Sequence, residues 1–243
     1  MNILQNLFYL GRQAKVTSTL IIINIIWFTI SRLFDSRSFN DTLEGIFLID
    51  WGADVSLLTF SGQYWRMLTS IFMHTNISHL VMNMLALLSV GTVLEKHIPK
   101  FVFIGIYFLT GLISSLTSDI ATIQNAVISC GASGSILGLI TALLGYSLVN
   151  RTNLENMPIK AIIASLILTA GLGMLPSINN MAHLGGAISG FILGLLISFC
   201  IKVFHYPNRL TFVLISILYF ITALGLYMGY MHFKLPDNFQ LYY

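Results

Sequence analysis

Long apolar stretches alternate with short polar segments along the whole chain. A helix that crosses the bilayer needs about 20 mostly apolar residues, at a rise of about 1.5 Å per residue. By this measure the pattern predicts seven transmembrane helices, at 16–33, 68–94, 101–116, 133–149, 159–175, 182–201 and 210–231. The predicted fold class is therefore all-α, a polytopic membrane bundle of seven helices.

Composition agrees with this prediction. Hydrophobic residues make up 56% of the 243 positions, charged residues only 9%, and the mean hydropathy is +0.83. A soluble domain carries about 25% charged residues, because its surface-to-volume ratio demands a polar shell. The lipid bilayer is thus the expected partner of the chain. The net charge of +3 is too small to indicate nucleic-acid binding.

The distribution of lysine and arginine predicts the orientation of the bundle. With the N-terminus in the cytoplasm, eight basic residues fall in inner segments and four in outer ones. Inner segments are the ones enriched in Lys and Arg, so we expect a cytoplasmic N-terminus and an external C-terminus. The predicted divisions are a cytoplasmic segment 1–15, a six-helix core 16–202 with an external loop 35–66, and an extra helix with an external tail at 203–243. Compact size and the lack of an organelle-type leader favour a bacterial plasma membrane.

Polar side chains within the predicted helices are candidates for function, because burying them in lipid is costly. The second helix carries His74, His79 and Asn83, the fourth begins at Ser133, and the sixth begins near His183. Counting helical rise back from the basic residue at each inner end puts Ser133, His183 and His79 about 26 to 29 Å above that end. All three then share the outer half of the membrane. For His74 alone, a structural role at the entry of its helix is favoured.

Glycines recur at every fourth position of the fourth and sixth helices, and this spacing forms a groove that allows close backbone approach. If the two grooves face each other, the Ser133 hydroxyl and the His183 imidazole come near hydrogen-bonding range, as an activated nucleophile requires. The groove positions are Gly134 and Gly138 on one helix, and Gly186, Gly190 and Gly194 on the other.

Four short motifs, in order, resemble the rhomboid intramembrane serine proteases. The resemblance spans about 51–200 and rests on Trp65-Arg66, His79-Leu-Val-Met-Asn83, Gly131-Ala132-Ser133-Gly134, and Ala182-His183-Leu184-Gly185-Gly186 followed by Gly190. The seventh helix is similar to that of the six-plus-one variants. One departure is Leu137, where many members carry an aromatic residue packed on the catalytic imidazole.

The resemblance implies a serine endopeptidase that uses a Ser133–His183 dyad and needs neither cofactor nor metal. No Asp or Glu occurs in the fourth or sixth helix, so a dyad is simpler than a triad. His183 acts as the general base. Expected oxyanion donors are the backbone N–H groups at Ser133, where a helix starts, and the side chains of His79 and Asn83.

Two segments between helices are expected to serve the site. The partly polar segment 119–130 is expected to dip inward and line a water-filled cavity. The glycine- and proline-containing segment 171–180 is either a mobile cap over the site or a plain interhelical turn. The implied substrates are membrane proteins with a transmembrane helix, cut where that helix frays near its outer end.

Other membrane functions fit less well. A non-proteolytic protein that binds client transmembrane helices is expected to lack Ser133 or His183, and both are present. A transporter or channel needs polar groups through the full depth, whereas the inner halves of the fourth and sixth helices are apolar and uncharged. A retinal-type receptor needs a lysine in the last helix, and 210–231 has none.

Overall fold

The computed structural model describes residues 14–35, 41–123, 127–150 and 180–204, together with the isolated positions Ser216 and Tyr227. Within these residues four helices are long and apolar enough to cross a membrane, namely α2 (Lys15–Leu33), α6 (Ile77–Leu94), α7 (Lys100–Thr122) and α10 (Asn180–Phe204). A fifth apolar helix, α8 (Ser133–Val149), is shorter. The chain is thus an integral membrane protein with a helical bundle. The predicted helix 159–175 lies outside the described residues. So do the predicted cap at 171–180, apart from Asn180, and the predicted helix 210–231, apart from Ser216 and Tyr227.

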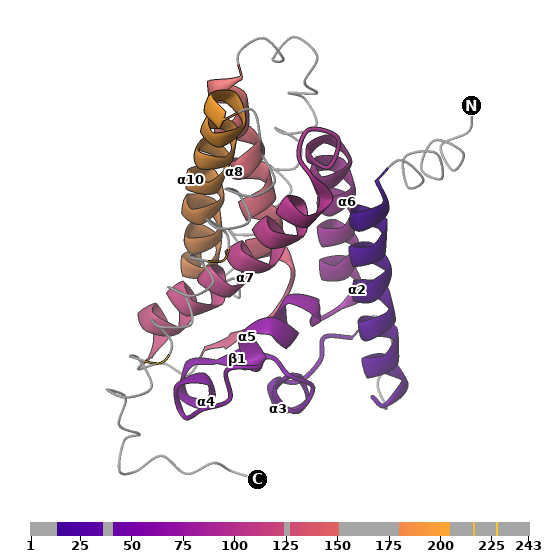
Figure 1. Cartoon of the computed structure of the whole chain (residues 1–243). Helices are drawn as coiled ribbons and strands as arrows, with labels where there is room; N and C mark the ends of the chain where they lie inside the picture. The colour runs from indigo at the N-terminus through magenta and orange to yellow at the C-terminus, as the bar shows by residue number, and fades with distance from the viewer. Residues whose placement is uncertain are drawn as a thin grey trace, which may run out of the picture.

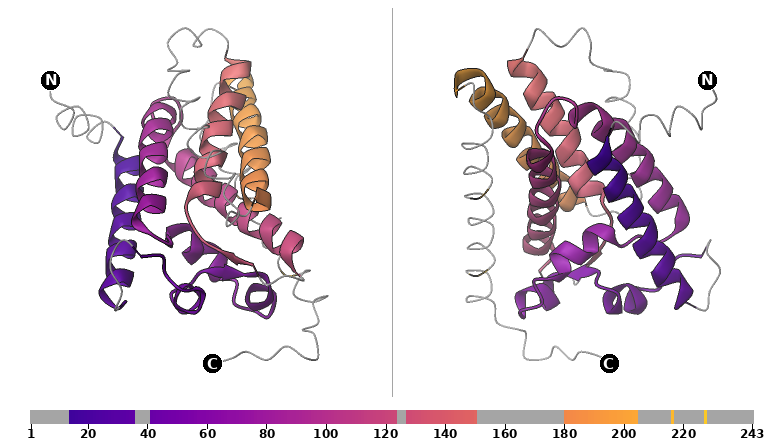
Figure 2. Two further views of the ribbon diagram at one scale, coloured as in Figure 1. Left: turned by 180° about the vertical axis from the view of Figure 1, so that it is seen from behind. Right: turned by 45° about the vertical axis from the view of Figure 1, so that its right-hand side comes forward.

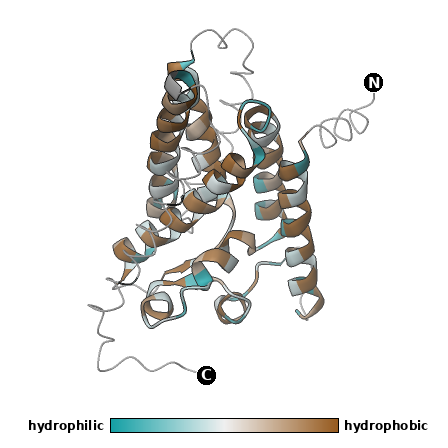
Figure 3. Ribbon diagram, in the orientation of Figure 1, coloured by the Kyte–Doolittle hydropathy of each residue, from teal (hydrophilic) through white to brown (hydrophobic). Residues whose placement is uncertain are grey.

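Helix α8 is the centre of the described bundle. It contacts α10, α7 and α6, while α2 packs against α6 on the far side (Figure 1; Figure 2). The most deeply buried side chains of α8 are Ile136, Leu139, Ile140 and Leu143. Large apolar side chains are also exposed on the outer faces of α2, α6 and α10, and apolar positions, coloured brown in Figure 3, recur along these helices. A helix that is apolar on its outer face as well as its inner one suits lipid as the surrounding solvent.

Short elements gather at one end of the bundle (Figure 1). There the extended segment before α8 pairs antiparallel with a segment of the loop that follows α2, with Asp54 opposite Ser129 and Val55 opposite Ile128. This pairing ties the chain that leads into Ser133 to the loop that was predicted at 35–66. The elements are α3 (Gly45–Asp50), β1 (Asp54–Val55), α4 (Ser56–Phe60), α5 (Arg66–Thr69), η1 (Ser70–Phe72) and β2 (Ile128–Ser129).

Two predicted helix boundaries were wrong. The second helix begins at Ile77 and not at position 68, because Asn76 is extended and its side chain accepts a hydrogen bond from the His79 N–H, which caps a new helix. The third continues to Thr122, beyond the predicted end at 116, so Asp119 is helical and buried. The helices predicted at 16–33 and 133–149 are confirmed within one residue, and that at 182–201 extends further at both ends.

The predicted glycine grooves do face each other. A Cβ atom on any of the three groove glycines of α10 would overlap the backbone of α8, so no larger residue fits without moving the helices apart. The facing pairs are Gly186 with Gly134, Gly190 with Gly138, and Gly194 with Ala142. This close approach sets the distance between the first turns of the two helices.

The first turn of α2 is capped from another helix. Glu95, at the end of α6, accepts hydrogen bonds from the backbone N–H groups of Val16 and Thr17, both at 2.9 Å, and from the Thr17 hydroxyl at 2.8 Å. Glu95 is buried, and α2 has no side-chain cap of its own. A carboxylate at a helix N-terminus satisfies free N–H donors and interacts favourably with the helix dipole.

Candidate active site

Ser133 and His183 lie within hydrogen-bonding distance of each other. The Ser133 Oγ atom is 2.8 Å from the His183 Nε2 atom. Ser133 is the first residue of α8 and His183 lies in the first turn of α10, so the glycine-lined contact of the two helices sets this distance. The Ser114 hydroxyl of α7 donates to the Ala182 carbonyl at 2.7 Å and so fixes the backbone next to His183.

Gly131 brings the chain close to His79 two residues before Ser133. Its φ of +118° is one that L-residues rarely adopt, and its N–H donates to the Ser70 carbonyl at 2.8 Å. A Cβ atom here would lie 2.9 Å from His79 Nε2 and 3.8 Å from Asn83 Nδ2. Both side chains of the second predicted helix therefore face the backbone that leads into Ser133.

Backbone and side-chain N–H groups lie close together at this point. No side chain among the described residues caps α8, so the N–H groups of its first turn, starting at Ser133, have no capping acceptor. The Asn83 amide is buried and donates to the His79 carbonyl at 3.1 Å, which occupies one of its two hydrogens. The positive end of the α8 dipole adds to the same local field.

A cavity of about 270 Å³ opens at this place. Ser133, His183 and His79 line it together with hydroxyl groups from α7 and β2. Of the segment 119–130, residues 128–130 line the cavity as predicted, while 119–122 belong to α7 instead. The serines and threonines that line the cavity, besides Ser133, are Thr42, Ser70, Thr75, Ser78, Ser114, Ser115, Ser129 and Ser135.

His74 packs against His79 rather than capping α6. The two ring centroids are 5.0 Å apart in an edge-to-face arrangement, and His74 Nδ1 lies 3.2 Å from the Phe72 carbonyl oxygen. Burial is the main reason why the pKa of His74 lies well below its usual value, so this imidazole is neutral. The cap of the helix is Asn76.

The Trp65–Arg66 pair holds the loop that follows α2. Arg66 is buried and donates to the Gln63 side chain at 2.7 Å, to the Ala53 carbonyl at 3.0 Å and to the Ile49 carbonyl. Its guanidinium lies 4.5 Å from the centre of the Trp65 ring, which is itself half exposed. A buried arginine whose donors reach several carbonyls fixes the backbone that carries them.

Sequence reasoning missed several buried polar residues near the site. Asp54 lies in β1, the Thr59 hydroxyl donates to it, and burial raises its pKa above the usual range. The sequence pattern alone did not mark Asp54 as a buried residue. Arg32 and Thr75 were missed as well, since an arginine at a helix end and a lone threonine carry no signal of burial.

The comparisons with known proteins agree with this arrangement. The model of the Rhomboid domain matches residues 61–200. The chain is 36% identical over 145 residues to RHOMBOID-like protein 5 of Arabidopsis thaliana, a match that covers 59% of this chain and 47% of that protein. It is 39% identical over 145 residues to Rhomboid protease GluP of Bacillus subtilis, covering 59% of this chain and 28% of GluP.

A longer match joins it to Rhomboid protease AarA of Providencia stuartii, with 31% identity over 215 residues that cover 77% of this chain and 74% of AarA. The chain spans about half or less of the length of the Arabidopsis relative and of GluP. The family model covers more than half of the sequence and includes all four motifs. The chain belongs to the rhomboid family.

Proposed function

We propose that this protein is a serine endopeptidase that cleaves other membrane proteins within or near the outer part of a transmembrane helix. The observation that carries the proposal is the 2.8 Å contact between Ser133 Oγ and His183 Nε2 beside a cavity among apolar helices. The names of GluP and AarA, both rhomboid proteases, support it.

In the proposed reaction Ser133 is the nucleophile and His183 is its general base. As Oγ attacks the scissile carbonyl, its proton passes to His183 Nε2, which then gives it to the departing amine. This leaves an acyl ester on Ser133, and a water molecule deprotonated by the same imidazole hydrolyses it. No carboxylate lies on α8 or α10, so the pair works as a dyad.

The proposed oxyanion site lies between α6 and the start of α8. The Ser133 N–H, the His79 ring and the Asn83 amide supply the donors, because both side chains face the Gly131 backbone beside the nucleophile. Removing one such donor typically costs about a hundredfold or more in rate.

The proposed substrates follow from the depth of the site. A transmembrane helix hides its carbonyls in internal hydrogen bonds, so the chain must unwind locally before Ser133 can reach one. The serine and threonine hydroxyls of the cavity wall suit the water that hydrolysis requires. We further propose that the N-terminus faces the cytoplasm, the C-terminus faces outward, and the membrane is a bacterial plasma membrane.

Labelling with a fluorophosphonate probe tests the nucleophile. Wild-type protein in detergent should be labelled, while Ser133→Ala should not be and His183→Ala should react far more slowly. The matched controls are Ser147→Ala, a buried serine elsewhere on α8, and His97→Ala, beyond the end of α6. Labelling of Ser133→Ala at the wild-type rate contradicts the assignment.

Cleavage of a model single-span protein in liposomes tests the activity itself. Wild-type protein should release two fragments, and Ser133→Ala should release none. Binding of the substrate without labelling or cleavage by the wild type favours the alternative, a non-proteolytic protein that binds client helices.

A further inference from the structure

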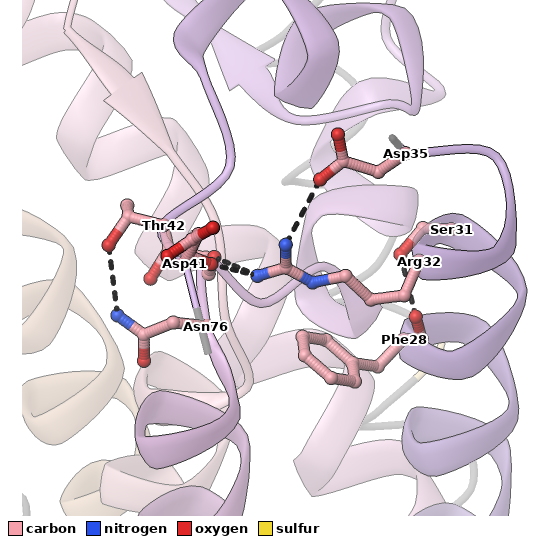
Figure 4. A network of polar contacts seen from close by, with 8 residues as sticks. Phe28, Ser31, Arg32, Asp35, Asp41, Thr42 and Asn76 are labelled. Carbon is pink, nitrogen blue, oxygen red and sulfur yellow. Dashed lines mark hydrogen bonds and ion pairs between the residues drawn. The ribbon is translucent and has the colours of Figure 1, made fainter. Parts of the chain in front are cut away.

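Arg32 is a buried cation at the end of α2, with only 2% of its surface exposed. One side of its guanidinium meets Asp35 at 3.0 Å, and the Phe28 ring lies 5.2 Å away. On the other side Nη2 donates to the Asp41 carbonyl (Figure 4). It also donates to the Thr75 carbonyl at 3.0 Å. A buried charge persists only when it is paired and hydrogen-bonded, so these contacts fix the two backbone segments that supply the carbonyls.

The two segments come from distant parts of the sequence and form one wall of the cavity. The Leu43 N–H donates to the same Thr75 carbonyl at 2.9 Å, so this oxygen accepts two hydrogen bonds. Next to it the Asn76 side chain contacts the Thr42 hydroxyl at 3.5 Å (Figure 4). Thr42, Thr75 and Asn76 all line the cavity. Arg32 therefore fixes the backbone of this part of the cavity wall.

Thr75 connects this wall to His79. Its hydroxyl lies 3.2 Å from His79 Nδ1, and its backbone is anchored by Arg32. The Cε1–Nε2 edge of the imidazole faces Gly131. In a neutral imidazole one nitrogen donates and the other accepts, so the partner of Nδ1 decides whether Nε2 carries the proton.

We propose that Thr75, anchored by Arg32, is a positioning residue that holds His79 in the orientation and tautomer that present an Nε2–H donor to the oxyanion. The Thr75 hydroxyl donates to Nδ1, which leaves the imidazole proton on Nε2, next to Gly131 and the start of α8. This inference rests on the proposed function, since it needs an oxyanion to form at Ser133. Arg32 and Thr75 both lie outside the four sequence motifs that carry the family resemblance.

A double-mutant cycle on substrate cleavage in liposomes tests this role. Thr75→Val keeps the shape of the side chain but removes the hydroxyl, so kcat should fall about tenfold, less than the hundredfold typical for a lost donor, with KM unchanged. Thr75→Ser should restore most of the activity. In a His79→Ala background Thr75→Val should have no further effect, because it acts only through that ring. Thr19→Val, an exposed threonine on α2, is the matched control.

Arg32→Lys tests the anchor. It keeps the charge opposite Asp35 but loses the planar fork, so kcat should again fall severalfold, and again not in the His79→Ala background. Unchanged kcat in Thr75→Val or Arg32→Lys overturns the proposal. A fall that persists without His79, or one that appears only in KM, also overturns it. A wild type that cuts nothing fails the proposed function instead, which separates the two hypotheses.

Discussion

Replacing Gly190 with alanine should damage stability and activity together. A Cβ atom at this position would overlap the Gly138 carbonyl oxygen and would lie 2.5 Å from the Gly138 Cα, whereas ordinary van der Waals contacts begin at 3.4 Å. The obstacle is backbone and cannot rotate away, so α8 and α10 must separate by at least about 0.9 Å, an overpacking that costs about 1–3 kcal/mol. The same shift stretches the 2.8 Å contact between Ser133 and His183 to at least about 3.7 Å, beyond a hydrogen bond.

The assay compares wild type, Gly190→Ala and Phe199→Ala in detergent and in liposomes. Phe199 lies on the same helix and is 54% exposed, so its truncation leaves the α8 contact intact. We expect the melting temperature of Gly190→Ala to fall by about 2–12 °C, and cleavage at a temperature well below melting to fall more than tenfold. A Gly190→Ala protein with wild-type melting and wild-type cleavage refutes the idea that this helix contact sets the Ser133–His183 distance.

Two further predictions concern buried carboxylates. Glu95→Ala removes the cap of α2 and should lower the free energy of unfolding by about 2–4 kcal/mol, while the exposed neighbour Lys96→Ala should change it by no more than about 0.5 kcal/mol, both measured by denaturant unfolding in detergent. Burial raises the pKa of Asp54 above its ordinary 3.8, so its contribution to stability is full below that value and is lost as the pH rises through the folded-state pKa. Asp54→Asn should therefore gain melting temperature relative to wild type as the pH rises from below 3.8 through the folded-state pKa of Asp54, and a difference that stays constant across a full pH series contradicts this.

The sequence predicted helices well wherever lipid alone decides the pattern. In α2 and α8 most positions are apolar and the ends are marked by polar residues, so the boundaries were right within one residue. The start of α6 was missed because the apolar residues of α5 and η1 merge with those of α6 when hydropathy is averaged over the length of a transmembrane helix, so the short polar segment 74–76 does not stand out. The information was present in Asn76, whose side chain caps the helix from three residues before His79, a local signal that hydropathy averages away.

The end of α7 was missed for the opposite reason. Its last turns carry serines, threonines and Asp119, and a polar run reads as a loop. In the fold these side chains turn inward, and Ser118 lies 3.0 Å from Ser129 of β2. Polar residues can continue a transmembrane helix when their partners come from another segment, and such partners are not visible from local sequence.

One part of the candidate site could be predicted from local sequence patterns and another part could not. The approach of Ser133 to His183 was predictable because glycine spacing is a local pattern that states which helix faces can meet. The support of His79 was not, because Arg32 and Thr75 are 43 positions apart and meet through a backbone carbonyl. Every residue has a backbone carbonyl, so the sequence does not indicate which carbonyl a distant side chain such as Arg32 will contact.

The helix contact at Gly190 and the side chain of Thr75 support different parts of the site, so the effect of changing both can be predicted from the two single changes. The α8–α10 contact at Gly190 sets the distance within the dyad, whereas Thr75 orients His79 on a separate helix. Independent effects on the transition state add as free energies, so the fall in kcat of Thr75→Val/Gly190→Ala should equal the product of the two single falls, within about twofold. A much smaller combined fall means that both changes act through one shared element. Gly131 is then the candidate, because it touches the His79 ring and leads directly into Ser133.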